Sequence, residues 1–485
     1  MKIDFIGRIL AITLLLALLT GNTYAGCVGD TTGTDYGCGD TVTESCTFNE
    51  DMDCESGHGL AIGADNITID GNGHTLNGVA PGTCEGLGIE RSGIYNKARD
   101  NITIKNLEIT NFCAGIYFRY DDEIGDSVER ITIGDCEIHH NGAASGGDTT
   151  TQGIKWIGVF DSVITNNKIH DNAGSGAACT SGGNGIFING ISGVGAWNNT
   201  ITGNEIYNNA KAGFLTRMMC KDTTIAGNEI YANGQAGIVL RCKKSEKHTI
   251  EENNVHENYG AGIWIGGPDN TIRHNTVTGN RNGSLYTGVV GEYGSGIKVC
   301  RAEAHNNEII SNTACGNDFA DIEVCVGIGV TGTTGSDNTC DRVEGYDDAG
   351  TTGCRYACIH ADELARELTA QGWALYGTDQ CPWCVKQSEE FGDAFGHLTY
   401  INCMENKSAC TDAGIQGIPC WASPDGVLHP GYHNLTMLSK LVGGYQRAHP
   451  TPTPTTKMST SPATVGFGSA SALAAMLIVF LMRRR

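Results

Sequence analysis

Proline is scarce in this chain, with 10 among 485 residues, and the last four stand at or after Pro450. Basic residues are few as well, because 32 lysines and arginines face 54 carboxylates, which leaves a formal net charge of −22. That charge favours solubility and argues against nucleic acid or an anionic membrane surface as a partner. Glycine is abundant at 68 residues, and with so little proline it indicates turn-rich β structure followed by a stiff tail.

The first residues have the layout of a signal peptide. Residues 1–25 carry Lys2 and Arg8, then an apolar stretch, and end in the small-x-small pattern Thr23-Tyr24-Ala25. Cys27 follows so closely that lipid attachment to it is the alternative to simple cleavage. Either reading predicts an exported protein.

The last residues predict attachment to the cell. Residues 447–464 are rich in Thr, Pro and Ser, as expected for an extended stalk. Residues 465–485 join eighteen largely apolar residues to three arginines, which predicts a transmembrane anchor or a sorting signal with a cytoplasmic end. The layout resembles archaeal C-terminal sorting signals. We therefore expect a cell-surface protein, anchored to the cytoplasmic membrane by its C-terminus with its bulk outside.

All 21 cysteines follow the signal peptide, which implies an oxidising compartment and a disulfide framework. Sixteen lie between Cys27 and Cys358, and five lie between Cys381 and Cys420. Among the sixteen no CxxC pair stands opposite another, so a structural zinc site is the weaker alternative. The spacing leaves the pairing open.

Between residues 60 and 345 the sequence repeats. An Asn-x-Ile/Val-x-x-Asn hexamer recurs, mostly at intervals of 22 to 25 residues, and the longer intervals hold loop insertions. One turn of a parallel β-helix has that length. A small-Gly-apolar element, such as Ala212-Gly213-Phe214, supplies a second short strand per coil and leaves no room for helices. The hexamers begin at Asn167, Asn204, Asn228, Asn253, Asn275 and Asn307, with a degenerate copy at Cys136.

Stacked coils explain this pattern physically. Each coil closes its backbone hydrogen bonds on the next, and the isoleucines and valines fill the interior. The asparagines are expected at the corners, where they tolerate left-handed backbone and form side-chain ladders. Metal or sugar binding by these asparagines is the alternative.

Residues 66–78 read Asn-Ile-Thr-Ile-Asp-Gly-Asn-Gly-His-Thr-Leu-Asn-Gly. They resemble the opening coil of the right-handed β-helix proteins of the pectin-lyase superfamily, particularly the NosD-like, carbohydrate-binding and sugar-hydrolase (CASH) group. The resemblance implies a mainly β fold, with a right-handed single-stranded parallel β-helix over 60–345. A Cys-rich cap over 26–59 and a Cys-containing linker over 346–360 would flank it.

Residues 361–446 change character. A helical pattern begins near Ala361 and stops at Gly372, and residues 373–376 read as a short buried strand. Cys381-Pro382-Trp383-Cys384 follows, and then a helix that extends to about Phe391. This places Cys381 at a helix N-terminus, where free N–H groups and the helix dipole favour the thiolate over the thiol.

The segment from Trp373 to about Gly443 resembles thioredoxin-fold domains, closest to those fused to or partnered with vitamin K epoxide reductase homologues. The resemblance implies a small α/β domain in which Cys381 is the nucleophile and Cys384 the resolving thiol. It also implies that Pro419 is a cis-proline facing them. The alternative for the CxxC pair is a structural disulfide or half of a metal site. The matching motifs are Tyr376-Gly377, Cys381-Pro382-Trp383-Cys384, the extra pair Cys403 and Cys410, and Gly417-Ile418-Pro419 followed by Cys420-Trp421.

Three further positions bear on this resemblance. Cys403 and Cys410 would form a second disulfide, either structural or a relay. Cys420 is then left over, as a buried inert thiol or as a third redox-active sulfur. Leu375 stands where thioredoxins carry a buried carboxylate, so proton removal from Cys384 would need another group or water.

Two functions therefore stand. The first is a thiol-disulfide oxidoreductase that acts on the thiols and disulfides of exported proteins, with the β-helix as a spacer or glycan-binding module. Its electron partner would be a membrane protein like vitamin K epoxide reductase or another quinone-linked protein. The second makes the β-helix the principal part, a polysaccharide-binding protein or a lyase, epimerase or hydrolase. We expect no cofactor and no bound metal under either.

The β-helix offers one candidate binding feature. Alignment of the coils on the small-Gly-apolar element puts Arg119, Arg217 and Arg241 at the same offset. Stacked arginines repel each other unless an anion or a carboxylate lies between them. The column is thus a candidate site for an acidic cell-surface polysaccharide, and the alternative is surface arginines paired with local carboxylates.

Overall fold

The computed structural model describes residues 26–442 apart from 81, 83, 85–90, 122, 124–126, 144–150, 175–181, 192, 242–243 and 284–292. The expected signal peptide, stalk and C-terminal anchor (1–25, 447–464 and 465–485) lie outside the described residues. Within the described part of the chain, no helix has the length and apolar character needed to cross a membrane.

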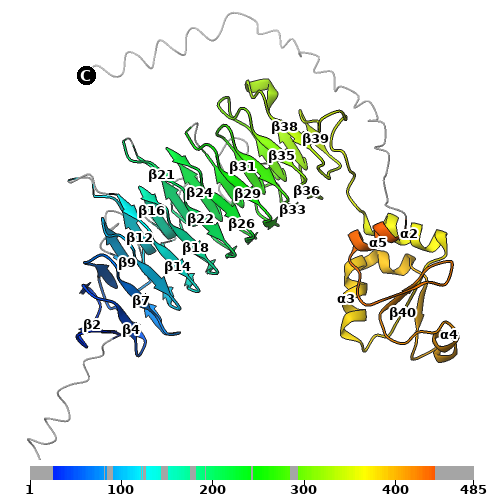
Figure 1. The fold of residues 1–485 in the computed structure, drawn as a ribbon, viewed down its shortest axis with the longest axis horizontal. Coiled ribbons are helices and arrows are strands. Elements are labelled where there is room, and N and C mark those ends of the chain that lie inside the picture. The colour runs from blue at the N-terminus through cyan, green and yellow to red at the C-terminus, as the bar shows by residue number, and fades with distance from the viewer. Residues whose placement is uncertain are drawn as a thin grey trace, which may run out of the picture. The chain divides into compact units, whose positions relative to one another are not determined.

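Short strands from β1 to β39 stack into three long sheets, which run side by side along one axis (Figure 1). Sheet 1 has 13 strands: β1 (Cys27–Gly29), β2 (Asp35–Tyr36), β4 (Cys46–Phe48), β7 (Thr68–Asp70), β10 (Thr103–Lys105), β14 (Thr132–Gly134), β18 (Val163–Thr165), β22 (Thr200–Thr202), β26 (Thr224–Ala226), β29 (Thr249–Glu251), β32 (Thr271–Arg273), β35 (Glu308–Ile310) and β38 (Thr334–Ser336).

Sheet 2 has 12 strands: β3 (Thr41–Val42), β6 (Leu60–Ile62), β9 (Ser92–Lys97), β12 (Ala114–Arg119), β16 (Gln152–Ile157), β20 (Asn184–Asn189), β24 (Phe214–Arg217), β28 (Ile238–Leu240), β31 (Ile263–Ile265), β34 (Ile297–Val299), β37 (Ile322–Val324) and β39 (Val343–Glu344). Sheet 3 has 10: β5 (Met52–Asp53), β8 (Thr75–Asn77), β11 (Glu108–Thr110), β15 (Glu137–His139), β19 (Lys168–His170), β23 (Glu205–Tyr207), β27 (Glu229–Tyr231), β30 (Asn254–His256), β33 (Thr276–Thr278) and β36 (Thr313–Cys315). Two small pairs, β13 (Val128–Glu129) with β17 (Val159–Phe160) and β21 (Ala196–Trp197) with β25 (Cys220–Lys221), and the 3₁₀ turn η2 (Val326–Ile328) complete this part.

Aliphatic side chains fill the interior of the stack. In sheet 1 the middle residues of consecutive strands, Ile201, Ile225 and Ile250, pair in parallel register and are fully buried. Burial of one such side chain contributes about 1.5–3 kcal/mol, so the repeated isoleucine sets the register as well as the stability. The expected parallel β-helix is confirmed.

Asparagine ladders hold the turns between sheets 1 and 3. Asn204 donates from Nδ2 to Asn228 Oδ1 at 3.0 Å, Asn228 donates to Asn253 at 2.9 Å, and Asn253 donates to Asn275 at 2.9 Å. The left-handed backbone lies one residue earlier than expected, for example at Gly203 with φ 65°. The ladder asparagines are therefore selected for their side-chain amides.

One repeat lies on a different sheet from the others. The hexamer at Asn307 contains β35 of sheet 1, and Asn307 accepts from Asn270 Nδ2 at 3.0 Å. The ladder continues instead through Asn312, to which Asn275 donates at 2.9 Å. The sheet 3 strand of this coil is β36, and it carries Ala314 where the hexamer pattern has Ile or Val, so the pattern selected the sheet 1 strand instead.

Disulfides pin both ends of the stack. At the N-terminal end Cys27 bonds to Cys46, and Cys38 bonds to Cys54. Strands β3, β4 and β5 already pair in parallel with β6, β7 and β8, so the parallel sheets begin inside residues 26–59. At the other end the bonds are Cys300–Cys325, Cys315–Cys358 and Cys340–Cys354.

Residues 361–442 form a small α/β part around a four-stranded sheet in the order β41-β40-β42-β43 (Figure 1). The predicted helix stop at Gly372 is confirmed, since this residue has φ 87° and caps α2. Leu368 of α2, Phe391 of α3 and Trp421 of β42 meet in the core. The elements are α2 (Ala361–Gln371), β40 (Ala374–Gly377), α3 (Pro382–Phe391), η3 (Gly392–His397), β41 (Tyr400–Asn402), α4 (Lys407–Asp412), β42 (Cys420–Ala422), β43 (Leu428–Pro430) and α5 (Leu435–Leu441).

Candidate functional site

The candidate site lies at the N-terminus of α3, after the loop that connects it to β40. Strand β40 pairs with β41 in parallel and with β42 antiparallel, so it is held on both sides. The chain leaves β40 at Gly377 and reaches Cys381, which is the N-cap residue of α3. Pro382 occupies the first helical position, where its missing N–H costs nothing.

The Cys381 thiol lies at the helix end, partly exposed. Its Sγ accepts a hydrogen bond from the Cys384 backbone N–H at 3.4 Å. Partial burial raises the pKa of Cys381, but hydrogen bonds from the Cys384 side chain and from the backbone N–H groups of Cys384 and Trp383 outweigh it, so the pKa is lowered. Cys381 is therefore the more readily ionised sulfur of the two.

The Cys384 thiol behaves in the opposite way. It is buried, and burial together with its hydrogen bond to Cys381 raises its pKa to about 11. The pair thus joins an accessible sulfur that ionises easily to a buried sulfur that holds its proton. This asymmetry suits one thiol for attack and the other for a second, slower step.

A groove runs past the Cys381 sulfur. Cys381 Sγ lies 3.7 Å from the Ile418 carbonyl oxygen, and the Ile418–Pro419 peptide bond is cis. Trp383, Ile418, Pro419, Gly431 and Tyr432 line a cavity of about 350 Å³ at this point. Its walls are largely apolar, and the Trp383 side chain is 57% exposed.

The remaining cysteines of this part gather in one apolar cluster. Cys403 and Cys410 are joined in a disulfide. Cys420 is a buried free thiol in the same apolar cluster as Cys410 and Tyr376. Burial raises the pKa of Cys420, which keeps it protonated and slow to react.

Sequence reasoning missed two residues beside Cys384. Asp379 precedes the CxxC motif by two residues, and Tyr400 opens β41, which pairs in parallel with β40. Both line a cavity of about 250 Å³ that also touches Cys384. The spacing of Asp379 was visible in the sequence, whereas Tyr400 reaches the site only through strand pairing.

A family model described as "Right handed beta helix region" matches residues 17–190 and 183–290, which is more than half of the chain. The chain belongs to the right-handed β-helix family. Seven disulfides join cysteines in the part of the chain that the structure describes. Because disulfides persist in oxidising compartments, they indicate an exported protein.

Other comparisons add three similar proteins. The thiol-disulfide oxidoreductase LTO1 of Arabidopsis thaliana is 34% identical over 93 residues, which cover 17% of this chain and 24% of LTO1. The chain thus spans about a quarter of that relative. Among solved structures, this chain is similar to the Dettilon tailspike protein, with 16% identity and a TM-score of 0.41 over 67% of this chain and 62% of that chain. It is also similar to the mannuronan C-5 epimerase AlgE4 A-module of Azotobacter vinelandii, with 17% identity and a TM-score of 0.41 over 67% of this chain and 79% of that chain.

The three predicted arginines lie along one edge of sheet 2, with Arg119 and Arg217 at the ends of β12 and β24 and Arg241 directly after β28. Pairing runs from Arg119 through Ile157 and Asn189 to Arg217, so two coils separate the first two arginines. Arg241 follows Leu240, which pairs with Thr216, and so continues the register. Arg119 also donates from Nε to the Tyr120 carbonyl oxygen at 3.3 Å.

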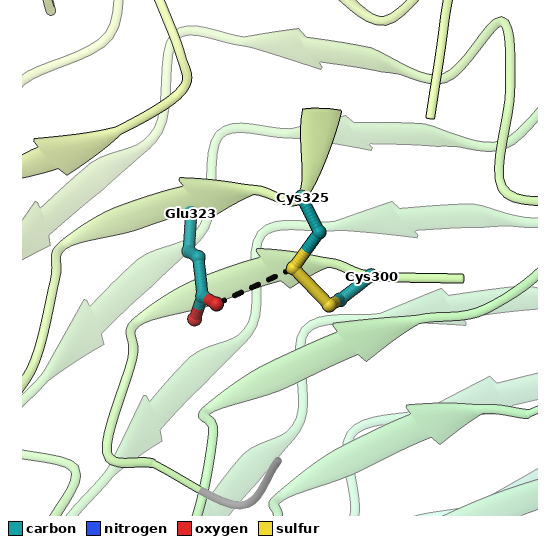
Figure 2. Close-up of side chains that lie close together, drawn as sticks. All are labelled: Cys300, Glu323 and Cys325. Carbon is teal, nitrogen blue, oxygen red and sulfur yellow. Dashed lines mark hydrogen bonds between the residues drawn. A yellow bond between two sulfur atoms is a disulfide. The ribbon is translucent and has the colours of Figure 1, made fainter. Parts of the chain in front are cut away.

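One cluster in the β-helix has the residue types of a metal site. Figure 2 shows Cys300, Glu323 and Cys325 together, with their ligand-type atoms within 4.8 Å of one another. The two sulfurs are bonded to each other, and the Glu323 carboxylate lies 2.9 Å from the buried Lys298 ammonium. Since a disulfide offers no thiolate, the oxidised cluster is a cross-link beside an ion pair.

Proposed function

We propose that this β-helix protein is an exported thiol-disulfide oxidoreductase that acts on other exported proteins through Cys381 and Cys384. The observation that carries the proposal is the position of the two thiols: Cys381 is the partly exposed N-cap of α3, its Sγ accepts from the Cys384 N–H at 3.4 Å, and Cys384 is buried one turn later. The lowered pKa of Cys381 and the raised pKa of Cys384 agree with this arrangement. The resemblance of residues 373–443 to thioredoxin-fold domains and the similarity to LTO1 support it.

The chemistry is an exchange of disulfide bonds. The Cys381 thiolate attacks one sulfur of a client disulfide, and the S–S bond breaks with its electron pair on the other client sulfur, which takes up a proton. Cys384 then loses its proton and attacks Cys381 Sγ, which releases the second client thiolate. The client is reduced by two electrons, and the Cys381–Cys384 dithiol becomes a disulfide. The reverse sequence oxidises a client dithiol.

The groove beside Cys381 would hold the client. An extended segment lying along Ile418 and Pro419 brings its sulfur toward Cys381, while an apolar side chain packs against the exposed Trp383 ring, whose centroid lies 6.3 Å from that of Tyr432. Lys386 fixes those two rings, because its Nζ lies 5.3 Å from the Trp383 centroid and 4.8 Å from the Tyr432 centroid. Electrons would pass to or from a membrane protein like vitamin K epoxide reductase or another quinone-linked partner.

The β-helix would act as a spacer or as a glycan-binding module that holds the redox part near the cell surface. The shared column of Arg119 and Arg217 supports binding of an acidic polysaccharide. Binding of the full chain to immobilised alginate or polygalacturonate, compared with Arg217→Ala, tests this role. Retention of neither protein would leave the β-helix as a spacer, whereas equal retention of both would place the glycan away from Arg217.

Reduction of insulin and reactivation of scrambled ribonuclease by the purified full chain test the redox activity. Both should require Cys381, so Cys381→Ser should abolish them, whereas Cys420→Ser should leave them within about twofold because Cys420 is buried with a raised pKa. Activity that survives Cys381→Ser would overturn the proposal.

A further inference from the structure

The second step of the proposed exchange needs an acceptor for the Cys384 proton. The Cys384 thiol is buried and its pKa is about 11, so at neutral pH it is almost wholly protonated. Leu375, in the middle of β40, is buried and carries no group that could accept a proton. The acceptor must therefore reach Cys384 from another side.

The cavity of about 250 Å³ provides such a side. Cys384, Asp379, Ser388 and Tyr400 are among its lining residues, and it shares none of the residues that line the client groove. A water molecule needs about 10–15 Å³ of such space, so the cavity has room for several waters. The Asp379 side chain is exposed, so a proton that arrives there can pass on to solvent.

The surroundings of Gly377 limit the distance between Cys384 Sγ and Tyr400 Oη. A Cβ atom added to Gly377 would lie 3.3 Å from both Cys384 Sγ and Tyr400 Oη, so these two atoms cannot be more than twice that distance apart. Tyr400 Oη in turn donates to Asp379 Oδ1 at 3.5 Å. A hydrogen-bonded line thus leads from the hydroxyl to the carboxylate, and the sulfur lies within one water of the hydroxyl.

The pKa shifts indicate which group between Cys384 and solvent keeps its proton and which can accept one. Burial and the negative charge of Asp379 raise the pKa of Tyr400 to about 12, so the phenol keeps its proton. The titratable groups that act on Cys384 are Cys381 from its own helix and Asp379 from the preceding loop, with Tyr400 facing it from β41. Of these, only the Asp379 carboxylate is a stable proton acceptor once Cys381 is bonded to a client.

We infer that Asp379 accepts the Cys384 proton through water in this cavity, and that Tyr400 positions the Asp379 carboxylate; the inference rests on the proposed function. In the mixed disulfide the Cys384 S–H bond breaks and its proton passes to Asp379. The sulfur electron pair forms the bond to Cys381 Sγ, and the electron pair of the Cys381–client bond leaves on the client sulfur. Asp379 then releases its proton to solvent.

The test follows both steps in one experiment on the purified, reduced full chain. Rapid mixing with 5,5′-dithiobis(2-nitrobenzoate) releases one thionitrobenzoate when Cys381 attacks and a second when Cys384 resolves the mixed disulfide. The two phases are measured from pH 5 to pH 10 for the native chain, Asp379→Asn, Tyr400→Phe and the control Asp412→Asn, which changes an exposed aspartate at the end of α4.

Asp379→Asn should leave the first phase within about twofold and slow the second about 100-fold near pH 7, at the lower end of the range for general bases. The deficit should shrink as the pH rises, because hydroxide then replaces the carboxylate. Tyr400→Phe should give a smaller deficit with the same pH dependence, and Asp412→Asn none.

The direction in which Asp379→Asn changes the second-phase rate distinguishes proton transfer from an effect of the Asp379 charge alone. The negative charge of Asp379 raises the pKa of Cys384, so if Asp379 acted by charge alone its neutralisation would speed up the second phase. An unchanged or faster second phase, or one slowed equally at every pH, overturns the inference alone. A first phase no faster than free cysteine overturns the proposed function, and the inference with it.

Discussion

The side chain of Gln387 joins α3 to the strand that follows Pro419: Trp421 donates from Nε1 to Gln387 Oε1 at 3.3 Å. The same oxygen accepts from the His433 backbone N–H at 2.8 Å, and Gln387 Nε2 donates to the His433 carbonyl oxygen at 2.8 Å. Gln387 is fully buried, so these bonds have no competition from water. They fix the helix that carries both thiols against the opposite wall of the groove.

Gln387→Leu should therefore destabilise the α/β part although it removes no apolar contact. The Trp421 N–H would stay buried without an acceptor, at about 1–3 kcal/mol, and the partly buried His433 N–H would lose its acceptor as well. The free energy of local unfolding is measured from the urea dependence of Cys420 alkylation, since Cys420 is 2% exposed. Gln416→Leu, at an exposed loop position, is the control, and an equal loss in both variants would contradict the role of Gln387.

Alkylation of Cys381 should depend on pH in a definite direction. Because its pKa is lowered, the rate with iodoacetamide should reach its half-maximum below the pH for free cysteine and change little above it. Cys384, with a pKa of about 11, should stay unmodified across the same range. Mass spectrometry of the labelled peptides distinguishes the two sites, and equal midpoints would contradict the asymmetry.

Trp383→Ala should weaken client binding more than chemistry. The exposed ring forms one wall of the groove, so its loss should raise KM for a disulfide-containing peptide about tenfold and leave kcat within about twofold, equivalent to about 1.4 kcal/mol. Trp197→Ala, which removes an exposed tryptophan of β21, is the matched control. A lower kcat at constant KM would place Trp383 in the chemical step instead.

Asn253→Ala should destabilise the β-helix far more than the neighbouring Asn254→Ala. Asn253 Nδ2 donates to Asn275 Oδ1 and to the Ile225 carbonyl oxygen within the buried ladder, and it also reaches the partly buried Glu251 carbonyl oxygen. Its removal leaves several buried groups unpaired, at about 3 kcal/mol or more. Asn254 makes one partly exposed bond, to Glu229 at 2.7 Å, so its loss should cost less than about 1 kcal/mol. Hydrogen exchange of the surrounding coils measures both.

The sequence was most informative where short-range rules apply. Cys381 as a helix N-cap follows from the strand, the CxxC spacing and Pro382, all within ten residues. The β-helix follows from a repeat that restates the same burial pattern coil after coil. Both features depend on neighbours along the chain or on a period, and neither requires a long-range contact to be known.

Features that depend on pairing between distant segments could not be predicted in the same way. Tyr400 lies beside Cys384 because β41 pairs in parallel with β40, a choice that the letters of β41 do not encode. The hexamer at Asn307 lies in sheet 1 while the others lie in sheet 3, and the stacking of Asn307 on Asn270 is what shows it. Asp379 lies only two residues before the CxxC motif in the sequence, but its importance depends on a cavity formed by three separate elements.

The Cys315–Cys358 disulfide determines how this molecule carries mechanical load. Residues 315 to 358 form a covalently closed loop, so a pull on the segment after Cys358 is transmitted straight to β36 and bypasses the last coil. That coil cannot be peeled away strand by strand, as the end of an unlocked stack could. Tension between the α/β part and the β-helix would therefore be borne by a covalent bond, while the hydrogen bonds of the last coil remain unstressed.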